Sequence, residues 1–161
     1  MLFSKPYAEI RVPVFFAKDL TGIKELSDLQ GFTIGAKSGD NVIRILRENG
    51  VDYIIEFNSY EEIIKAALDR KINIFTIDEP PAIYFLTKYK LLNRFKYGFN
   101  LYTGHFHRAV KKNNKHLLSI IEKGYSQIPE KQHNQIMNKW MGKSIAYWDY
   151  NSYLPFIIIG I

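Results

Sequence analysis

Residues 32–57 decide the fold, and they read FTIGAKSGDNVIRILRENGVDYIIEF. The apolar run Phe32–Ala36 predicts a buried strand, and Asn41–Glu48 has the spacing of an amphipathic helix that Asn49-Gly50 would close. A second apolar run, Tyr53–Phe57, predicts another strand. A strand, a helix and a strand in this order indicate a βαβ unit, whose two strands run parallel.

The same alternation continues toward the C-terminus. Ser59 and Glu62 form a capping-box pattern at the start of a helix, and Ile72–Ile77 predicts the next strand. Pro80 and Pro81 suit the first turn of a further helix. Strands that alternate with helices of about ten residues indicate an α/β fold, with a parallel or mostly parallel sheet covered on both faces.

Segments on either side of this stretch complete the expected architecture. Ile10–Ala17 predicts a strand, and Pro13 would place it at a sheet edge or at a bend. Two extended segments and two closing helices follow later in the chain, at Tyr97–Tyr102, Phe106–Val110, Lys115–Tyr125 and Pro129–Trp140.

Composition excludes several classes of protein. The 161 residues carry a formal charge of +6, but lysine and arginine are spread along the chain and match no nucleic-acid-binding signature. We therefore expect no nucleic acid partner. The chain has no cysteine, which excludes disulfides, thiolate metal sites and cysteine nucleophiles. His105 and His107 would share one face of a strand, but no third ligand has suitable spacing, so we expect no metal site and no cofactor.

Candidate binding residues lie in two loops that follow predicted strands. In an open α/β sheet, ligands bind beyond the carboxyl ends of the strands, next to helix N-termini that attract anions. One such loop is Lys37-Ser38-Gly39-Asp40-Asn41, and the other is Asp78-Glu79. Together they would offer an anion-attracting helix end and a carboxylate, which suits a zwitterion such as an amino acid. In the simpler interpretation, Asp40 is only a helix N-cap and Asp78 and Glu79 only place negative charge at a helix start.

Several segments, in order, resemble bacterial family 3 solute-binding proteins. FSKPY at 3–7 resembles the FS-x-PY segment of that family, and residues 23–37 resemble its L-x-D-L-x-G-x-x-I-G-V stretch, with 38–41 on its G-T-T turn. Asp78–Tyr84 resembles D-x-P-x-A-x-Y, Asn114–Ile121 resembles N-x-x-L-L-x-x-I, and 139–142 resemble the closing K-W-x-G. The resemblance covers about 140 residues.

The resemblance implies a periplasmic binding protein type 2-like fold, with two α/β lobes hinged by two crossing strands. Residues 1–144 would form a partial domain, with one complete lobe at about 14–104 and the remainder in the hinge and the C-terminal helices of the other lobe. The first half of that other lobe, roughly a hundred residues, would be missing. In the family this half carries the arginine that grips the ligand carboxylate, and Arg11 is not expected to replace it.

Site residues also follow from the resemblance. Asn41 and the backbone of its loop would bind the ligand carboxylate, Asp78 would bind the amino group, and Tyr7 would lie near the hinge. Asp40 replaces the threonine that the family places on this turn, which departs from the pattern of amino-acid specificity. The predicted ligand-binding residues are Tyr7, Lys37, Ser38, Gly39, Asp40, Asn41 and Asp78.

The two ends of the chain bear on its location. Residues 1–7 show no positively charged segment followed by an apolar stretch, so we expect no signal peptide in this chain. Residues 145–161 place tyrosine and tryptophan ahead of an apolar run, like a juxtamembrane segment and the start of a truncated transmembrane helix. Sensor histidine kinases and diguanylate cyclases often have this junction. A buried final strand or a disordered tail is the alternative.

These observations favour a binding protein that is not an enzyme. We expect a small-molecule ligand, a location in the periplasm or otherwise outside the cytoplasm, and association with the membrane in the full-length protein. A membrane anchor or a downstream signalling domain would be a further partner. Two alternatives stay open: an enzyme of the same fold, such as a dehydratase or the binding domain of a lytic transglycosylase, and a fragment that binds nothing.

Overall fold

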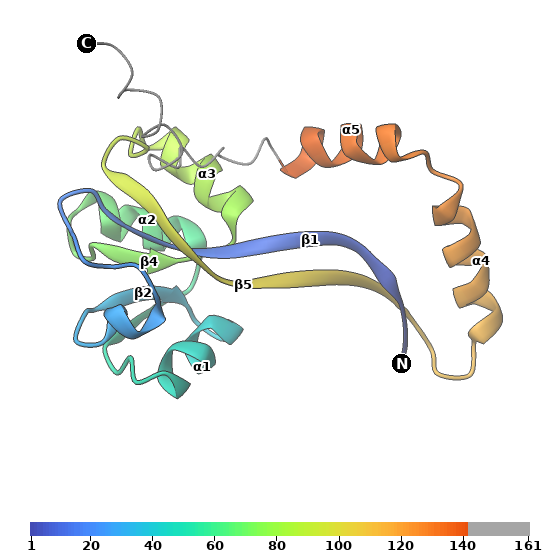
Figure 1. The fold of residues 1–161 in the computed structure, drawn as a ribbon, viewed down its shortest axis with the longest axis horizontal. Helices are drawn as coiled ribbons and strands as arrows, with labels where there is room; N and C mark the ends of the chain where they lie inside the picture. Colours follow the sequence, from blue (N-terminus) through green and yellow to red (C-terminus); the bar gives the residue numbers. More distant parts are fainter. Residues whose placement is uncertain (142–161) are drawn as a thin grey trace, which may run out of the picture.

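The computed structural model describes residues 1–141, which form a mixed sheet of five strands in the order β3-β2-β4-β1-β5 (Figure 1). The strands are β1 (Leu2–Ala17), β2 (Ile34–Lys37), β3 (Ile54–Phe57), β4 (Ile74–Thr76) and β5 (Phe95–Val110). The helices are η1 (Leu26–Leu29, a 3-10 helix), α1 (Asn41–Glu48), α2 (Tyr60–Leu68), α3 (Glu79–Lys88), α4 (Lys115–Ser126) and α5 (Glu130–Met141). The predicted α/β alternation through the middle of the chain is confirmed.

Strand direction divides the sheet into two parts. β2 pairs in parallel with β3 and with β4, whereas β1 pairs antiparallel with β4 and with β5. The prediction of a mostly parallel sheet is right for β3-β2-β4 and wrong for β1, because β1 lies outside the βαβ units from which strand direction was inferred. β1 lies between β4 and β5, but it pairs with β4 only from Val14 to Phe16, so Pro13 stands just beyond that pairing. The pairing with β5 shifts register on both sides of Pro13, as at a bend.

The core has one layer on each face of the sheet. On one face, β-strand residues pack with Leu29 and with Val42 and Leu46 of α1. On the other face, Phe15 and Phe75 stack with a ring-centroid distance of 5.3 Å beneath α2 and α3. In Figure 1, α1 lies on the opposite side of the sheet from α2 and α3. These two layers fix the ends of β2, β3 and β4, where the candidate loops begin.

β1 and β5 continue beyond the sheet as a long two-stranded ribbon that leads to α4 and α5 (Figure 1). From the sequence we predicted only the inner part of β1, at Ile10–Ala17, and two separate segments in place of the single strand β5. The outer half of the ribbon pairs Leu2 with Val110 and shifts register on both sides of Pro6. Most of its residues are partly or fully exposed, so the alternation of apolar and polar residues that predicts a strand is absent there.

None of the helices within residues 1–141 is long and apolar enough to cross a membrane. The predicted juxtamembrane segment and transmembrane start at 145–161 lie outside the described residues.

Candidate functional site

Three loops leave the sheet at the same edge. β2 ends at Lys37 and leads to α1, β3 ends at Phe57 and leads to α2, and β4 ends at Thr76 and leads to α3. Because these strands are parallel neighbours, their carboxyl ends share one side of the sheet, which we call the carboxyl rim. In open α/β sheets, this is where ligands bind.

The turn after β2 is shaped by Gly39 and capped by Asp40. Gly39 has φ +73°, a left-handed conformation that glycine adopts without strain. Asp40 is the N-cap of α1, and its Oδ1 accepts a long hydrogen bond of 3.5 Å from the backbone N–H of Val42. Ser38 is held on the β3 side, where its hydroxyl donates to Glu56 at 2.9 Å. The N-cap interpretation of Asp40 is therefore confirmed, but it accounts for only one of its carboxylate oxygens.

The hydroxyl of Tyr60 links the second carboxylate oxygen of Asp40 to the carboxylate of Asp78. The Tyr60 hydroxyl lies 3.2 Å from Oδ2 of Asp40 and 3.2 Å from Oδ2 of Asp78. A phenol hydroxyl has one proton, so it donates fully to one carboxylate at a time. The three loops of the rim thus contribute one group each to a single cluster, in which two negative charges compete for one donor.

Burial makes this cluster electrostatically costly. Partial burial raises the pKa of Asp78, the hydrogen bond from Tyr60 opposes that rise, and the charge of Asp40 adds to it. Burial, followed by the negative charges of Asp78 and Asp40, raises the pKa of Tyr60 far above its ordinary value, so its hydroxyl keeps its proton. Lys37 compensates in part: its Nζ lies 5.9 Å from the centroid of the Tyr60 ring, and its charge lowers the pKa of Asp78.

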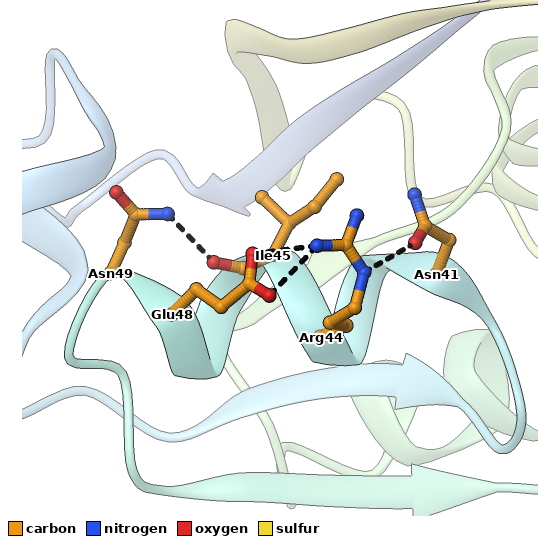
Figure 2. A network of polar contacts seen from close by, with 5 residues as sticks. All are labelled: Asn41, Arg44, Ile45, Glu48 and Asn49. Carbon is orange, nitrogen blue, oxygen red and sulfur yellow. Dashed lines mark hydrogen bonds and ion pairs between the residues drawn. The ribbon is translucent and has the colours of Figure 1, made fainter.

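Asn41 and Tyr102 border the cluster. Burial, followed by the charges of Asp40 and Asp78, raises the pKa of Tyr102 on β5, and a hydrogen bond with Asn41 opposes that rise. The Oδ1 of Asn41 accepts from Nε of Arg44 at 3.0 Å, and Arg44 also bonds both carboxylate oxygens of Glu48, as Figure 2 shows. Asn41 is thereby held in place at the first turn of α1.

Solved structures of binding proteins share this arrangement of strands and helices. An ancestral arginine-binding protein bound to glutamine matches with a TM-score of 0.69 and 23% identity, over 88% of this chain and 64% of that chain. The GluR0 ligand-binding core in complex with L-glutamate matches with a TM-score of 0.72 and 15% identity, over 87% of this chain and 63% of that chain. A histidine kinase sensor domain with similarity to periplasmic binding proteins matches with a TM-score of 0.70 and 17% identity, over 87% of this chain and 62% of that chain. No family model and no curated protein matches the sequence.

The chain has the periplasmic binding protein fold. It spans less than two thirds of each of these three structures. The resemblance predicted one complete lobe, which would be the sheet with α1–α3, a hinge, which would include the β1–β5 ribbon, and C-terminal helices of the other lobe, which would be α4 and α5. This division stays a prediction. The fold that the sequence resemblance implied is confirmed.

The structure brings most of the predicted site residues together. Asp40 and Asp78 share one hydroxyl, Asn41 and Lys37 act on the same cluster, and Gly39 and Ser38 form the turn beside it. The expectation that the two loops open onto one side of the sheet is therefore confirmed. The assignment of these residues to ligand binding stays a prediction.

Tyr7 is placed elsewhere. It lies in the outer ribbon, where its carbonyl accepts hydrogen bonds from the Tyr125 hydroxyl at 2.9 Å and from Nε2 of His133 at 3.0 Å. The guanidinium of Arg108 lies 4.3 Å from its ring centroid. These contacts fit the expected place near the hinge, and no contact within residues 1–141 joins Tyr7 to Asp40 or Asp78.

Sequence reasoning missed Tyr60, the residue that joins the two loops. The signal was present, because Tyr60 follows the helix cap Ser59 directly after β3, which ends at the same edge as β2 and β4. Applying the rule for strand ends to all three parallel strands would have included it.

A hollow of about 430 Å³ lies beside the same turn. Gly39 and Asp40 line it together with Arg47 and Glu56, but Asp78 does not. It therefore does not join the two loops, and we place the candidate site at the Asp40–Tyr60–Asp78 cluster.

Proposed function

We propose that this chain binds a small solute, an amino acid or a related small carboxylate, at the Asp40–Tyr60–Asp78 cluster. It would act as a receptor domain of a transport or signalling protein, outside the cytoplasmic membrane. Support comes from the fold, since similar structures are described as bound to glutamine, arginine or L-glutamate. It also comes from the convergence of the three loops on one side of the sheet.

The observation that carries the proposal is the competition of two carboxylates for one hydroxyl. With 3.2 Å from Tyr60 to each of Asp40 and Asp78, one carboxylate lacks a full donor at any moment. A ligand ammonium group would supply up to three donors and a positive charge, satisfying both carboxylates and relieving their repulsion. The cluster is therefore destabilised without a cation and suited to bind one.

Binding without turnover fits the chemistry of the same groups. Tyr60 has a raised pKa, which opposes its use as a base or nucleophile near neutral pH. Asp40 is engaged at the helix cap and by Tyr60. In the proposed receptor, ligand binding would shift the equilibrium between hinge states, and residues 145–161 would connect the domain to a membrane anchor or a signalling domain.

Thermal-shift measurements with an equimolar pool of the twenty standard amino acids, followed by single amino acids, test the proposal. We expect specific stabilisation of the wild type by at least one of them. Asp78→Asn should weaken that binding by about tenfold or more, because a charge-assisted hydrogen bond contributes about 1.5–3 kcal/mol. Asp52→Asn, at an exposed aspartate in the loop between α1 and β3, is the matched control and should bind like the wild type. No stabilisation by any amino acid, or equal binding by Asp78→Asn, would contradict the proposal.

A further inference from the structure

A hollow of about 440 Å³ lies at the end of the sheet away from the carboxyl rim, and we call it the basic hollow. Three loops meet there: the loop after β1, the loop before β4 and the loop before β5. Since β4 ends at the carboxyl rim, the loop before β4 lies at the opposite end of the strand. The lining residues are Ala17, Lys18, Asp19, Arg70, Asn73 and Arg94. None of these six belongs to the candidate site at the rim.

Backbone hydrogen bonds hold the three loops together. The N–H of Ala17 donates to the carbonyl of Asn73 at 2.9 Å. The N–H of Lys18 donates to the carbonyl of Arg94, also at 2.9 Å. Nζ of Lys96 donates to the carbonyl of Lys18 at 3.4 Å, which places a further positive charge beside the same loop. The shape of the basic hollow is therefore fixed by paired backbone groups.

Positive charge predominates in the lining of the basic hollow, which has three cations and one carboxylate. The guanidinium of Arg94 donates to two carbonyls in the last turn of α2, at 3.2 and 3.3 Å, which uses two of its five N–H groups. The side chains of Lys18 and Arg70 are exposed, and they form no hydrogen bond or ion pair within residues 1–141. Asp19 forms no ion pair within the same part of the chain. The cations therefore have donors and charge available for an anion.

Arg70 has a backbone conformation that glycine usually adopts. α1, α2 and α3 end with the same pair of backbone hydrogen bonds, the Schellman motif, in which one residue is left-handed. That residue is Gly50 after α1, with φ +79°, but it is Arg70 after α2, with φ +59°, and Lys90 after α3, with φ +57°. A side chain makes this conformation unfavourable. Glycine at position 70 would therefore favour folding, and strain of this kind is typical of residues at functional sites.

We propose that the basic hollow binds a small ligand through a phosphate group, which contacts Arg70, Arg94 and Lys18. Guanidinium groups bind phosphate oxygens through paired N–H donors, and lysine adds a point charge. A volume of about 440 Å³ is within the range of small-molecule sites, so a phosphate monoester would fit as well as free phosphate. This site is independent of the proposed function, because the basic hollow and the cluster at the carboxyl rim share no residue.

¹H–¹⁵N NMR titrations with inorganic phosphate, glycerol 3-phosphate and glycerol, at constant ionic strength, test the proposal. For the wild type, we expect both phosphates to shift backbone amides of residues 17–19, 69–73 and 94, and we expect glycerol to leave these amides unchanged. Tighter binding of glycerol 3-phosphate would identify a phosphate monoester as the ligand. Equal binding of the two phosphates would identify free phosphate. Either result supports the proposal.

The variant Arg70→Gly separates binding from folding. It should raise the melting temperature by about 2–4 °C, because it relieves the left-handed backbone. It should also weaken binding of glycerol 3-phosphate by about tenfold, because it removes a charge-assisted contact. Lys90→Gly is the matched control, since it removes the same charge from the same position of the motif after α3, and Lys90 does not line the basic hollow. Its melting temperature should rise similarly, with binding unchanged.

Three results would overturn the proposal. The first is that neither phosphate shifts the amides of the basic hollow. The second is that Arg70→Gly and Lys90→Gly weaken binding equally, which would mean that the anion responds only to net charge. The third is that Arg70→Gly keeps the affinity of the wild type, which would mean that Arg70 only places positive charge at the end of α2. Should Arg70→Gly fail to fold, Lys18→Gln decides, because it changes an exposed side chain, and unchanged affinity would overturn the proposal.

Discussion

The two regions of this molecule are packed very differently. The sheet region, which comprises β2–β4 with α1–α3, is covered on both faces by buried side chains. The ribbon region, which comprises the outer halves of β1 and β5 with α4 and α5, has no buried residue in α4. It also exposes many of the large apolar side chains of the described residues, namely Met1, Phe3, Phe106, Leu117, Ile120, Ile128 and Ile136.

The two regions are also held together by different kinds of contact. The ribbon region is held by polar and ring contacts: Tyr125 and His133 bond the Tyr7 carbonyl, and Arg108 lies 4.3 Å from the ring centroids of both Tyr7 and Tyr125. α4 is apolar on its outer side, where Leu117 and Ile120 are 41% and 54% exposed. These residues widen the apolar face of α4 beyond the part that is half-buried, and a surface helix normally packs such a face against another element. This agrees with the coverage of less than two thirds of the similar structures.

The largest expected difference between the regions concerns two isoleucines. Ile64 of α2 is fully buried, whereas Ile120 of α4 is 54% exposed. Ile64→Ala should lower the free energy of unfolding by about 2–5 kcal/mol, because it removes buried methylenes and leaves a cavity. Ile120→Ala should change it by no more than about 0.5 kcal/mol. Urea titration followed by circular dichroism measures both, and similar losses would mean that the outer side of α4 is covered.

Alanine substitutions at two glycines compare the packing of the two regions through smaller changes in stability. A Cβ at Gly35 of β2 would lie 2.4 Å from Cδ1 of Ile72 and 3.3 Å from Cε2 of Phe57, so Gly35→Ala should cost about 1–3 kcal/mol through overpacking. A Cβ at Gly124 of α4 would meet no atom within 4 Å, so Gly124→Ala should stabilise by about 0.5–1 kcal/mol through helix propensity. Thermal unfolding gives both values. Destabilisation by Gly124→Ala would contradict the open packing of the ribbon region.

The smallest effect concerns the cluster at the rim, where the sheet region carries an unfavourable charge. Burial raises the pKa of Asp78 above its ordinary value of 3.8, so its ionised form costs stability at pH values above the raised pKa. Asp78→Asn should therefore be more stable than the wild type at pH 7, and the difference should shrink as the pH falls toward 3.8. Unfolding free energies from pH 7 to pH 4 measure this difference, and Asp52→Asn, at an exposed aspartate, is measured alongside as the matched substitution. A gain that is absent at pH 7 or independent of pH would show that Asp78 is not destabilised.

Sequence reasoning succeeded where one residue pattern reports one local structure. The helix over Asn41–Glu48 was predicted with the bounds that the structure shows, because its cap, its apolar spacing and its Asn49-Gly50 end agree. The pairing of the Asp40 and Asp78 loops was also predictable, because parallel strands end on the same side of a sheet. The same rule, applied to β3, would also have found Tyr60. Local patterns could not predict the long ribbon, since its exposed strands lack alternation. They could not predict the Arg11–Glu79 ion pair either, because it depends on register between strands far apart in the sequence.

The most direct test of the account is a ¹H–¹⁵N NMR titration of the chain with the twenty standard amino acids in an equimolar pool. The account predicts that the largest shift changes fall on backbone amides of residues 37–42, 58–61 and 76–79, in the three loops that meet at Tyr60. Amides of α4, in the ribbon region, should change little. An unchanged spectrum, or changes confined to α4 and α5, would contradict binding at the carboxyl rim.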